Sequence, residues 1–293
     1  MKQDLFVHDG RPLVSKVAYE GDLRESIQLA VSLIGGIQKL VKKGDTILLK
    51  PNYNTADPFP GSSDPAFIRS IIEMLYEAGA AKVILAERTA LLHNRRVLEQ
   101  AGVVKVAKEA GAEVRVFGKD GWYTLFDFKG WRHVKVPGGQ FLRKVSLARE
   151  ALNIEKIVYA PLIKMHHAAE FTGAIKLSMG FVKPFFDQMT FHSKHLCEKL
   201  AELQLVLKPD LIIMDARKVF ITGGPAKGEM QEPNFILASG NQVAIDVEGV
   251  KILQGYAGNK LEGKSVWDLT QIKHAVELGL GPHSEEEYEI IKP

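Results

Sequence analysis

The 293-residue chain contains one cysteine, Cys197, so it cannot form an intramolecular disulfide. A single thiol also excludes a four-cysteine zinc site and an iron–sulfur cluster held by this chain alone. Long apolar stretches are absent as well, because the run from Ala174 to Val182 is short and contains Lys176. The first ten residues lack the apolar core of a secretory signal. We therefore expect a cytoplasmic protein that has no membrane partner.

The chain also lacks a basic stripe. Its 38 lysines and arginines are interspersed with 35 aspartates and glutamates, which gives a formal charge of +3. Nucleic acid is therefore not an expected partner. There is no internal repeat, and 46% of the residues are hydrophobic, which is enough to build a large core. We expect a single α/β domain over residues 1–293, with a possible inserted subdomain at about 118–150.

The first strong pattern is a strand, a helix and a second strand. Thr46–Lys50 is a short apolar run and predicts a buried strand. Asp64 and Pro65 are residue types favoured at a helix start, and apolar residues follow them at helical spacing. Lys82–Glu87 predicts the next strand. A strand, a helix and a strand in this order indicate a right-handed parallel unit.

The same alternation continues, and it is typical of a doubly wound, mostly parallel sheet. The expected strands are 113–117, 156–163, 210–215 and 235–238, and the expected helices are 96–110, one from about Thr172, 193–207, 243–253 and 266–278. Inserted into this pattern is an aromatic segment with Trp122, Tyr123, Phe126, Phe128 and Trp131. These side chains could fill the core of a β subdomain, or they could form a flap or a contact in a homo-oligomer.

Polar side chains follow the strands at their carboxyl ends, where open parallel sheets bind ligands. They are Lys50 and Asn52, Glu87 and Arg88, Lys164, His166 and His167, and Asp215 and Arg217. Lys50, Arg88 and Lys164 could hold the carboxylate or phosphate of a substrate. Turn formation or helix capping explains any one of these residues, but four strand ends converge. We therefore expect a small organic anion to bind at this edge.

Lys176 is the residue whose structural purpose is hardest to see. Its neighbours from Phe171 to Val182 are apolar or small on every side, which predicts a buried helix. A buried ammonium is costly unless it is paired, and burial lowers the pKa of a lysine toward that of a usable nucleophile. The structural alternatives are that the amine reaches solvent or meets a carboxylate such as Asp215.

Four histidines are candidates for the site. His166 and His167 are adjacent, so in an extended chain only one of them is expected to face a pocket. His192 and His195 are three apart, the spacing that places both on one face of a helix, where they could ligate a metal ion. Nickel, zinc or iron would suit such ligands. Solvated positions at a helix start explain His192 and His195 equally well.

Several motifs together resemble an uncharacterised bacterial and archaeal family, domain of unknown function 362. The motifs are KPNYNTADPFPGSSDP, PLIKMHHAAEFTGAIKLSMGFV, GGPAKGE and ILASGNQVAIDVEGVKIL. The resemblance spans nearly the whole chain but does not imply an activity. Many members resemble fusions with a ferredoxin-type module, whose cysteines are absent here, so no iron–sulfur cluster is expected.

The central motif also resembles the cofactor-bearing segment of the nickel-pincer lactate racemases. That family has a histidine, then Phe-Ser/Thr-Gly, then a cofactor-bearing lysine ten residues after the histidine. This chain has the same order in His166, Phe171, Thr172, Gly173 and Lys176. The resemblance implies that His166 moves a proton and that Thr172, Gly173 and Lys176 contact the cofactor.

Two further positions follow from this resemblance. A nickel-binding histidine stands sixteen residues after the lysine in the racemases, and His192 occupies that position here. The racemases' second catalytic histidine, directly after the second strand, is replaced by Glu87, which could serve as an alternative base.

Three functions are open at this point. The leading hypothesis is a racemase-like, isomerase-like or other cofactor-dependent enzyme acting on a small organic anion. In it, Lys176 and Lys50 contact the cofactor or substrate, His192 and His195 hold a metal ion, and the catalytic groups are His166, Glu87 and Asn52. The second hypothesis is a non-catalytic module that binds a metabolite or docks a partner. The third is a metal-free enzyme that uses Lys176 to form a Schiff base.

Overall fold

The computed structural model describes residues 3–90, 93–120 and 127–293, and their strands form a central nine-stranded sheet. The order is β1 (Val7–His8), β2 (Arg11–Ala18), β14 (Phe235–Ser239), β11 (Leu211–Ala216), β8 (Lys156–Tyr159), β3 (Thr46–Lys50), β4 (Lys82–Glu87) and β5 (Glu113–Val116), with β15 (Glu289–Ile291) beside β2. The five strands from β11 to β5 are parallel, whereas β14 and β1 are antiparallel to their neighbours. The expectation of a doubly wound, mostly parallel sheet is confirmed.

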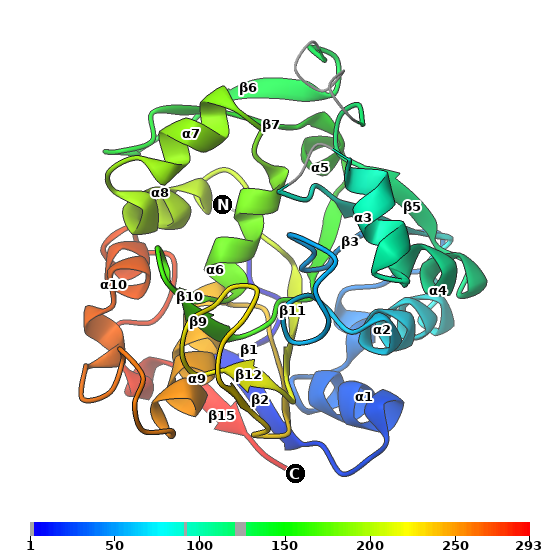
Figure 1. The fold of residues 1–293 in the computed structure, drawn as a ribbon. Coiled ribbons are helices and arrows are strands. Elements are labelled where there is room, and N and C mark those ends of the chain that lie inside the picture. The colour runs from blue at the N-terminus through cyan, green and yellow to red at the C-terminus, as the bar shows by residue number, and fades with distance from the viewer. Residues whose placement is uncertain (1–2, 91–92, 121–126) are drawn as a thin grey trace.

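Helices cover both faces of this sheet (Figure 1). One face carries α1 (Leu23–Leu33), α2 (Pro65–Glu77), α3 (Asn94–Gln100) and α4 (Val103–Glu109), and the other carries α6 (Ala174–Leu177), α8 (Leu196–Leu203), α9 (Gln242–Gln254) and α10 (Thr270–Glu277). Each face of the sheet has its own hydrophobic core. In strand β3, Ile47 and Leu49 pack in the core under α1 to α4, and Leu48 packs in the core on the other face, because side chains alternate along a strand. None of the helices in the described ranges is long and apolar enough to cross a bilayer.

Smaller elements lie outside the main sheet. They are the pairs β9 (Lys164–His166) with β10 (Glu170–Thr172), β12 (Val219–Phe220) with β13 (Met230–Gln231), and β6 (Trp131–Lys135) with β7 (Lys144–Ala148), and the helices α5 (Arg149–Asn153) and α7 (Phe186–His192). The hairpin of β6 and β7 lies within the range expected for an insert. Trp131 is buried and Phe128 is exposed, whereas Trp122, Tyr123 and Phe126 lie outside the described residues.

Several expected boundaries are wrong. The helix expected over 96–110 is split into α3 and α4, because Gly102 adopts a left-handed φ of 77°. The strand expected over 156–163 ends at Tyr159, and the chain then turns away from the sheet into β9. The helix expected over 193–207 is shorter, because α8 covers only Leu196–Leu203. Strand β14 is antiparallel, a direction that its apolar pattern does not encode.

The short helix α6 is anchored by one carboxylate. Asp246 of α9 is fully buried and accepts hydrogen bonds from the backbone N–H groups of Ala174 (2.6 Å) and Ile175 (2.9 Å). A helix start leaves such N–H groups without partners in its own backbone. Gly173 is required here because a Cβ at this position would overlap the Asp246 carboxylate.

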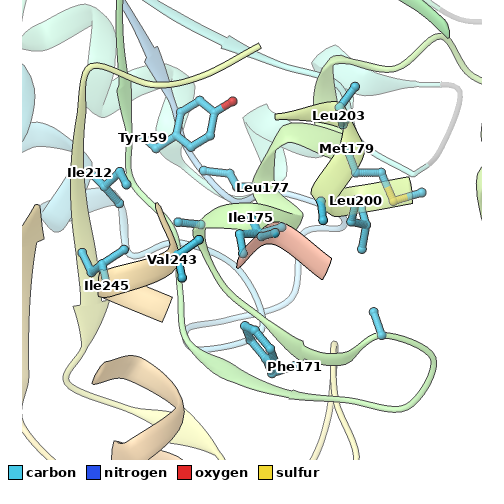
Figure 2. Close-up of a cluster of buried hydrophobic side chains, with 14 of the residues drawn as sticks. Tyr159, Phe171, Ile175, Leu177, Met179, Leu200, Leu203, Ile212, Val243 and Ile245 are labelled. Carbon is cyan, nitrogen blue, oxygen red and sulfur yellow. The ribbon is translucent and has the colours of Figure 1, made fainter. Parts of the chain in front are cut away.

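Apolar packing fixes α6 from several sides. Ile175 and Leu177 lie in a buried cluster with Tyr159 of β8, Leu200 of α8 and Val243 of α9 (Figure 2). The helix contacts both α8 and α9. The residue between the two apolar side chains of α6 is therefore held at a fixed place in the fold.

We predict that Asp246→Asn lowers the free energy of unfolding by about 1–3 kcal/mol, because an amide cannot accept from both N–H groups and one is left buried without a partner. Urea denaturation followed by circular dichroism measures this. Asp268→Asn is the matched control, since Asp268 is exposed, and a change within about 0.5 kcal/mol is expected there. Equal stabilities of the two variants would contradict the anchoring role.

Candidate functional site

A pocket of about 150 Å³ opens at the carboxyl edge of the parallel strands. Strands β4 and β5 extend the sheet to one side of β3, whereas β8 and β11 extend it to the other, so the strand order reverses between β3 and β8. Open α/β sheets bind ligands at such a reversal, because the connecting loops diverge there. Lys50 at the end of β3 and Lys164 beyond β8 both line the pocket.

A buried ion pair joins the ends of β3 and β4. Nζ of Lys50 lies 2.5 Å from Oε1 of Glu87, which also accepts from the backbone N–H of Arg88 at 2.8 Å. Oε2 of Glu87 accepts from the backbone N–H of Tyr53 at 2.9 Å. Burial raises the pKa of Glu87 and lowers the pKa of Lys50, and the ion pair opposes both shifts. Both carboxylate oxygens are occupied, so the geometry disfavours the expected role of Glu87 as a base.

Close packing holds this pair in place. A Cβ at Gly180 would lie 2.6 Å from Cε and 2.7 Å from Nζ of Lys50, so a larger residue there would displace the amine. The Lys50 amine also donates to the carbonyl of Pro51 at 2.8 Å. The Lys50 amine is therefore already bound by Glu87 and Pro51. Lys50 does line the pocket, as expected for a residue that contacts a ligand.

His166 faces the pocket, which decides between the two adjacent histidines. It is 7% exposed and lines the cavity, whereas His167 is exposed and its Nδ1 contacts the carbonyl of Gly224. The rings do not point to opposite faces, because β9 ends at His166 and they stack with centroids 4.9 Å apart.

Hydrogen bonds set the protonation of His166. Its Nδ1 accepts from the backbone N–H groups of Ala168 (3.1 Å) and Ala169 (3.2 Å), which places the proton of the neutral ring on Nε2. Burial, together with the charges of Lys176 and other cations, lowers the pKa of His166 to about 2. The neutral ring is thus a hydrogen-bond donor through Nε2, and its capacity to accept a proton as a general base is low.

Lys176 and Lys164 both line the pocket, and neither forms an ion pair with a carboxylate of the described residues. Lys176 is partly exposed, lines the pocket and makes no hydrogen bond or ion pair within that part of the chain. Burial and the charge of Lys50 lower the pKa of Lys176 to about 8. Lys164 donates to the carbonyls of Pro60 and Gly61, and burial and Lys176 lower its pKa to about 7.

The two histidines expected to bind a metal do not share a helix face. α7 ends at His192, which lines the pocket, and His195 precedes α8 with a left-handed φ of 66°. His195 stacks on Phe141 and contacts Glu198 at 3.0 Å, outside the pocket lining. No three histidine, cysteine, aspartate or glutamate side chains in the described ranges gather in an arrangement that could hold a metal ion.

Asp215 and Gly173 were expected to contact Lys176 and a cofactor, respectively, but each contacts other residues of the fold instead. Asp215 is buried and paired with Arg217, whose Nη2 also lies 2.8 Å from Oδ2 of Asp64 at the start of α2. Asp215 therefore does not meet Lys176. Gly173, expected at a cofactor, instead gives Asp246 room to approach α6.

Asn52 and Thr172 line the pocket as expected, and Tyr53 is a lining residue that the sequence reasoning missed. The hydroxyl groups of Tyr53 and Thr172 are buried without a hydrogen-bond partner. A buried polar group of this kind usually meets a ligand or water. Asp246 was missed as well, although it is an acidic residue in an apolar helix, the same signal that singled out Lys176.

We predict that Lys50→Met lowers the free energy of unfolding by about 3–5 kcal/mol, because it leaves the Glu87 carboxylate buried without its counter-ion. The matched control is Lys82→Met, since Lys82 pairs with Glu113 between neighbouring strands but both side chains are more than 40% exposed. The control is expected to lose less than about 1 kcal/mol. Thermal and urea unfolding measure both variants, and a similar loss in the two would refute the distinction.

The chain matches the family described as Domain of unknown function (DUF362) over residues 47–251. A relative, the thylakoid-associated protein sll1697 of Synechocystis sp., is 26% identical over 252 residues, covering 83% of this chain and 74% of the relative. Two solved structures are similar at 11% identity: a structural-genomics protein from Thermotoga maritima (TM-score 0.46, 79% of this chain) and the lactate racemase apoprotein from Thermoanaerobacterium thermosaccharolyticum (TM-score 0.45, 84% of this chain). The chain spans 57% of the length of each. Because the family match covers most of the sequence, this protein belongs to the DUF362 family.

Proposed function

We propose that this protein is an enzyme acting on a small organic anion and that the amine of Lys176 forms the covalent bond of the reaction, to the substrate or to a cofactor. The observation that carries the proposal is the state of this amine. It lines the pocket, makes no described hydrogen bond or ion pair, and has a pKa lowered to about 8. An amine in this state is a nucleophile near neutral pH.

The surrounding groups suit an anionic carbonyl compound. Lys164 and Arg88 line the same pocket and attract its carboxylate. Nε2–H of His166 is available to donate to the carbonyl oxygen, which draws electrons from the carbonyl carbon. Attack by the neutral amine forms a C–N bond, and the carbonyl oxygen leaves as water with the two protons that the amine nitrogen gives up, which leaves an imine.

The cofactor version uses the same amine. Lys176 and His192 both line the pocket, so these two residues fit a lysine-linked metal cofactor that brings ligands of its own. Such a group would supply a metal centre beside the bound acid. Because His195 does not line the pocket, we do not propose that His192 and His195 together bind the metal ion.

A non-catalytic binding protein is the second candidate, and the cationic pocket lining favours it equally. The two candidates differ in the covalent reactivity of the amine, since a binder needs charge but no nucleophile. A binder gains thermal stability from an acid that it never converts.

We predict that Lys176 acylates with a midpoint near pH 8, because only the neutral amine reacts and burial favours that form. An ordinary exposed lysine has its midpoint near pH 10.4. Trace acetylation across pH 6–11, read by peptide mass spectrometry, measures the curve, with the peptide of exposed Lys105 as the internal reference. A Lys176 curve that coincides with the reference would contradict the proposal.

We also predict a covalent adduct at Lys176. In protein from the native host the adduct is a cofactor mass; in recombinant protein it is the reduced imine left by borohydride after incubation with 2-oxo acids. Lys176→Arg removes the adduct, and Lys105→Arg leaves it unchanged. If neither preparation carries a modification at Lys176, while acids still raise the melting temperature, the protein is a binder.

A further inference from the structure

We infer that the ligand of this pocket is a small dianion, an acid that carries two ionised groups. The inference rests on the proposed function, which requires only an organic anion. It is carried by two ammonium groups, those of Lys164 and Lys176, which line one cavity and form no ion pair with a described carboxylate. When the ligand first binds, before any covalent step, one negative charge on it would leave the second cation unmatched.

The two lysines bring hydrogen-bond donors to the pocket that the described residues do not use. An ammonium has three N–H donors. Lys164 uses two of them on the carbonyls of Pro60 and Gly61, and Lys176 uses none on the described residues. The matching ligand is therefore rich in acceptor oxygens.

Other charged groups of the pocket do not cancel the two ammonium charges. Glu87 is the carboxylate of the lining, and it is paired with Lys50 and capped by two backbone N–H groups. Arg88 and His192 also line the cavity. Burial and the charge of Lys176 lower the pKa of both Lys164 and His192, and the charge of Arg88 adds to the effect on His192.

Two more groups act on these amines from outside the lining. For each amine, burial and the charge of a neighbouring lysine lower the pKa, and these are the larger effects. Asp57 raises the pKa of Lys164, and Cys197 raises the pKa of Lys176, by less. The net field in the pocket is therefore positive. The cavity volume of about 150 Å³ suits a small acid.

The test compares acids of equal length and different charge by calorimetry. Malonate, succinate and glutarate are titrated against propionate, butyrate and valerate, and inorganic phosphate serves as a compact dianion. We expect the best dicarboxylate to bind at least about tenfold more tightly than its monocarboxylate partner, a difference of about 1.4 kcal/mol. If phosphate binds more tightly than every dicarboxylate, both negative charges of the ligand belong to one phosphate group.

Charge variants connect the preference to the two lysines. Lys176→Gln and Lys164→Gln should each reduce the ratio of dianion to monoanion affinity at least about fivefold, whereas Lys176→Arg retains the ratio because it retains the charge. Lys105→Gln removes one exposed charge outside the pocket and should leave the ratio unchanged. The ratio is used because a loosened pocket weakens binding of both acids alike. Circular dichroism confirms folding, and Lys176→Gln alone suffices if Lys164→Gln unfolds.

The two proposals fail in different ways. Equal affinity for acids of both charges, with an adduct still formed at Lys176, would overturn the dianion and leave the enzyme proposal standing. A ratio that is insensitive to both glutamine variants would also overturn it. If no acid of either charge binds, the pocket is not an anion site and both proposals fall.

Discussion

The buried pair of Lys50 and Glu87 is the constraint on which the pocket depends. It joins the carboxyl ends of β3 and β4 beside the strand reversal, and it fixes the following loop through the backbone N–H of Tyr53. Two desolvated charges persist there because both oxygens of the carboxylate accept hydrogen bonds. With Glu87 neutralised in this way, the other cations of the lining set the sign of the field in the cavity.

The reactive amine is placed by a second set of contacts. The four-residue helix α6 is too short to be stable alone. Its first N–H groups are bound by Asp246, and its apolar side chains pack against α8, α9 and the sheet. Tertiary packing therefore supplies the free energy that keeps Lys176 in a largely desolvated position. The lowered pKa of this lysine is the consequence of that placement.

Much of the scaffold was predictable from local patterns. Strands β3 and β4 and helix α2 begin and end where the apolar runs, Asp64 and Pro65 indicate. The candidate site was partly predictable, since Lys50, Asn52, His166, Thr172, Lys176 and His192 all line one pocket. His195 and Gly173 were misplaced, because the spacing of residues does not show where a helix breaks or which carboxylate packs against a glycine.

The sequence by itself determined the βαβ alternation, and with it the edge of the sheet at which polar strand ends meet, because hydrophobic periodicity and helix caps are local properties. It also singled out a lysine in an apolar segment. Only the tertiary structure decided that Glu87 forms an ion pair with Lys50, that His166 carries its proton on Nε2, and that Lys176 has no carboxylate partner in the described chain. These outcomes depend on contacts between residues far apart in sequence, and local pattern does not encode which side chains such contacts bring together.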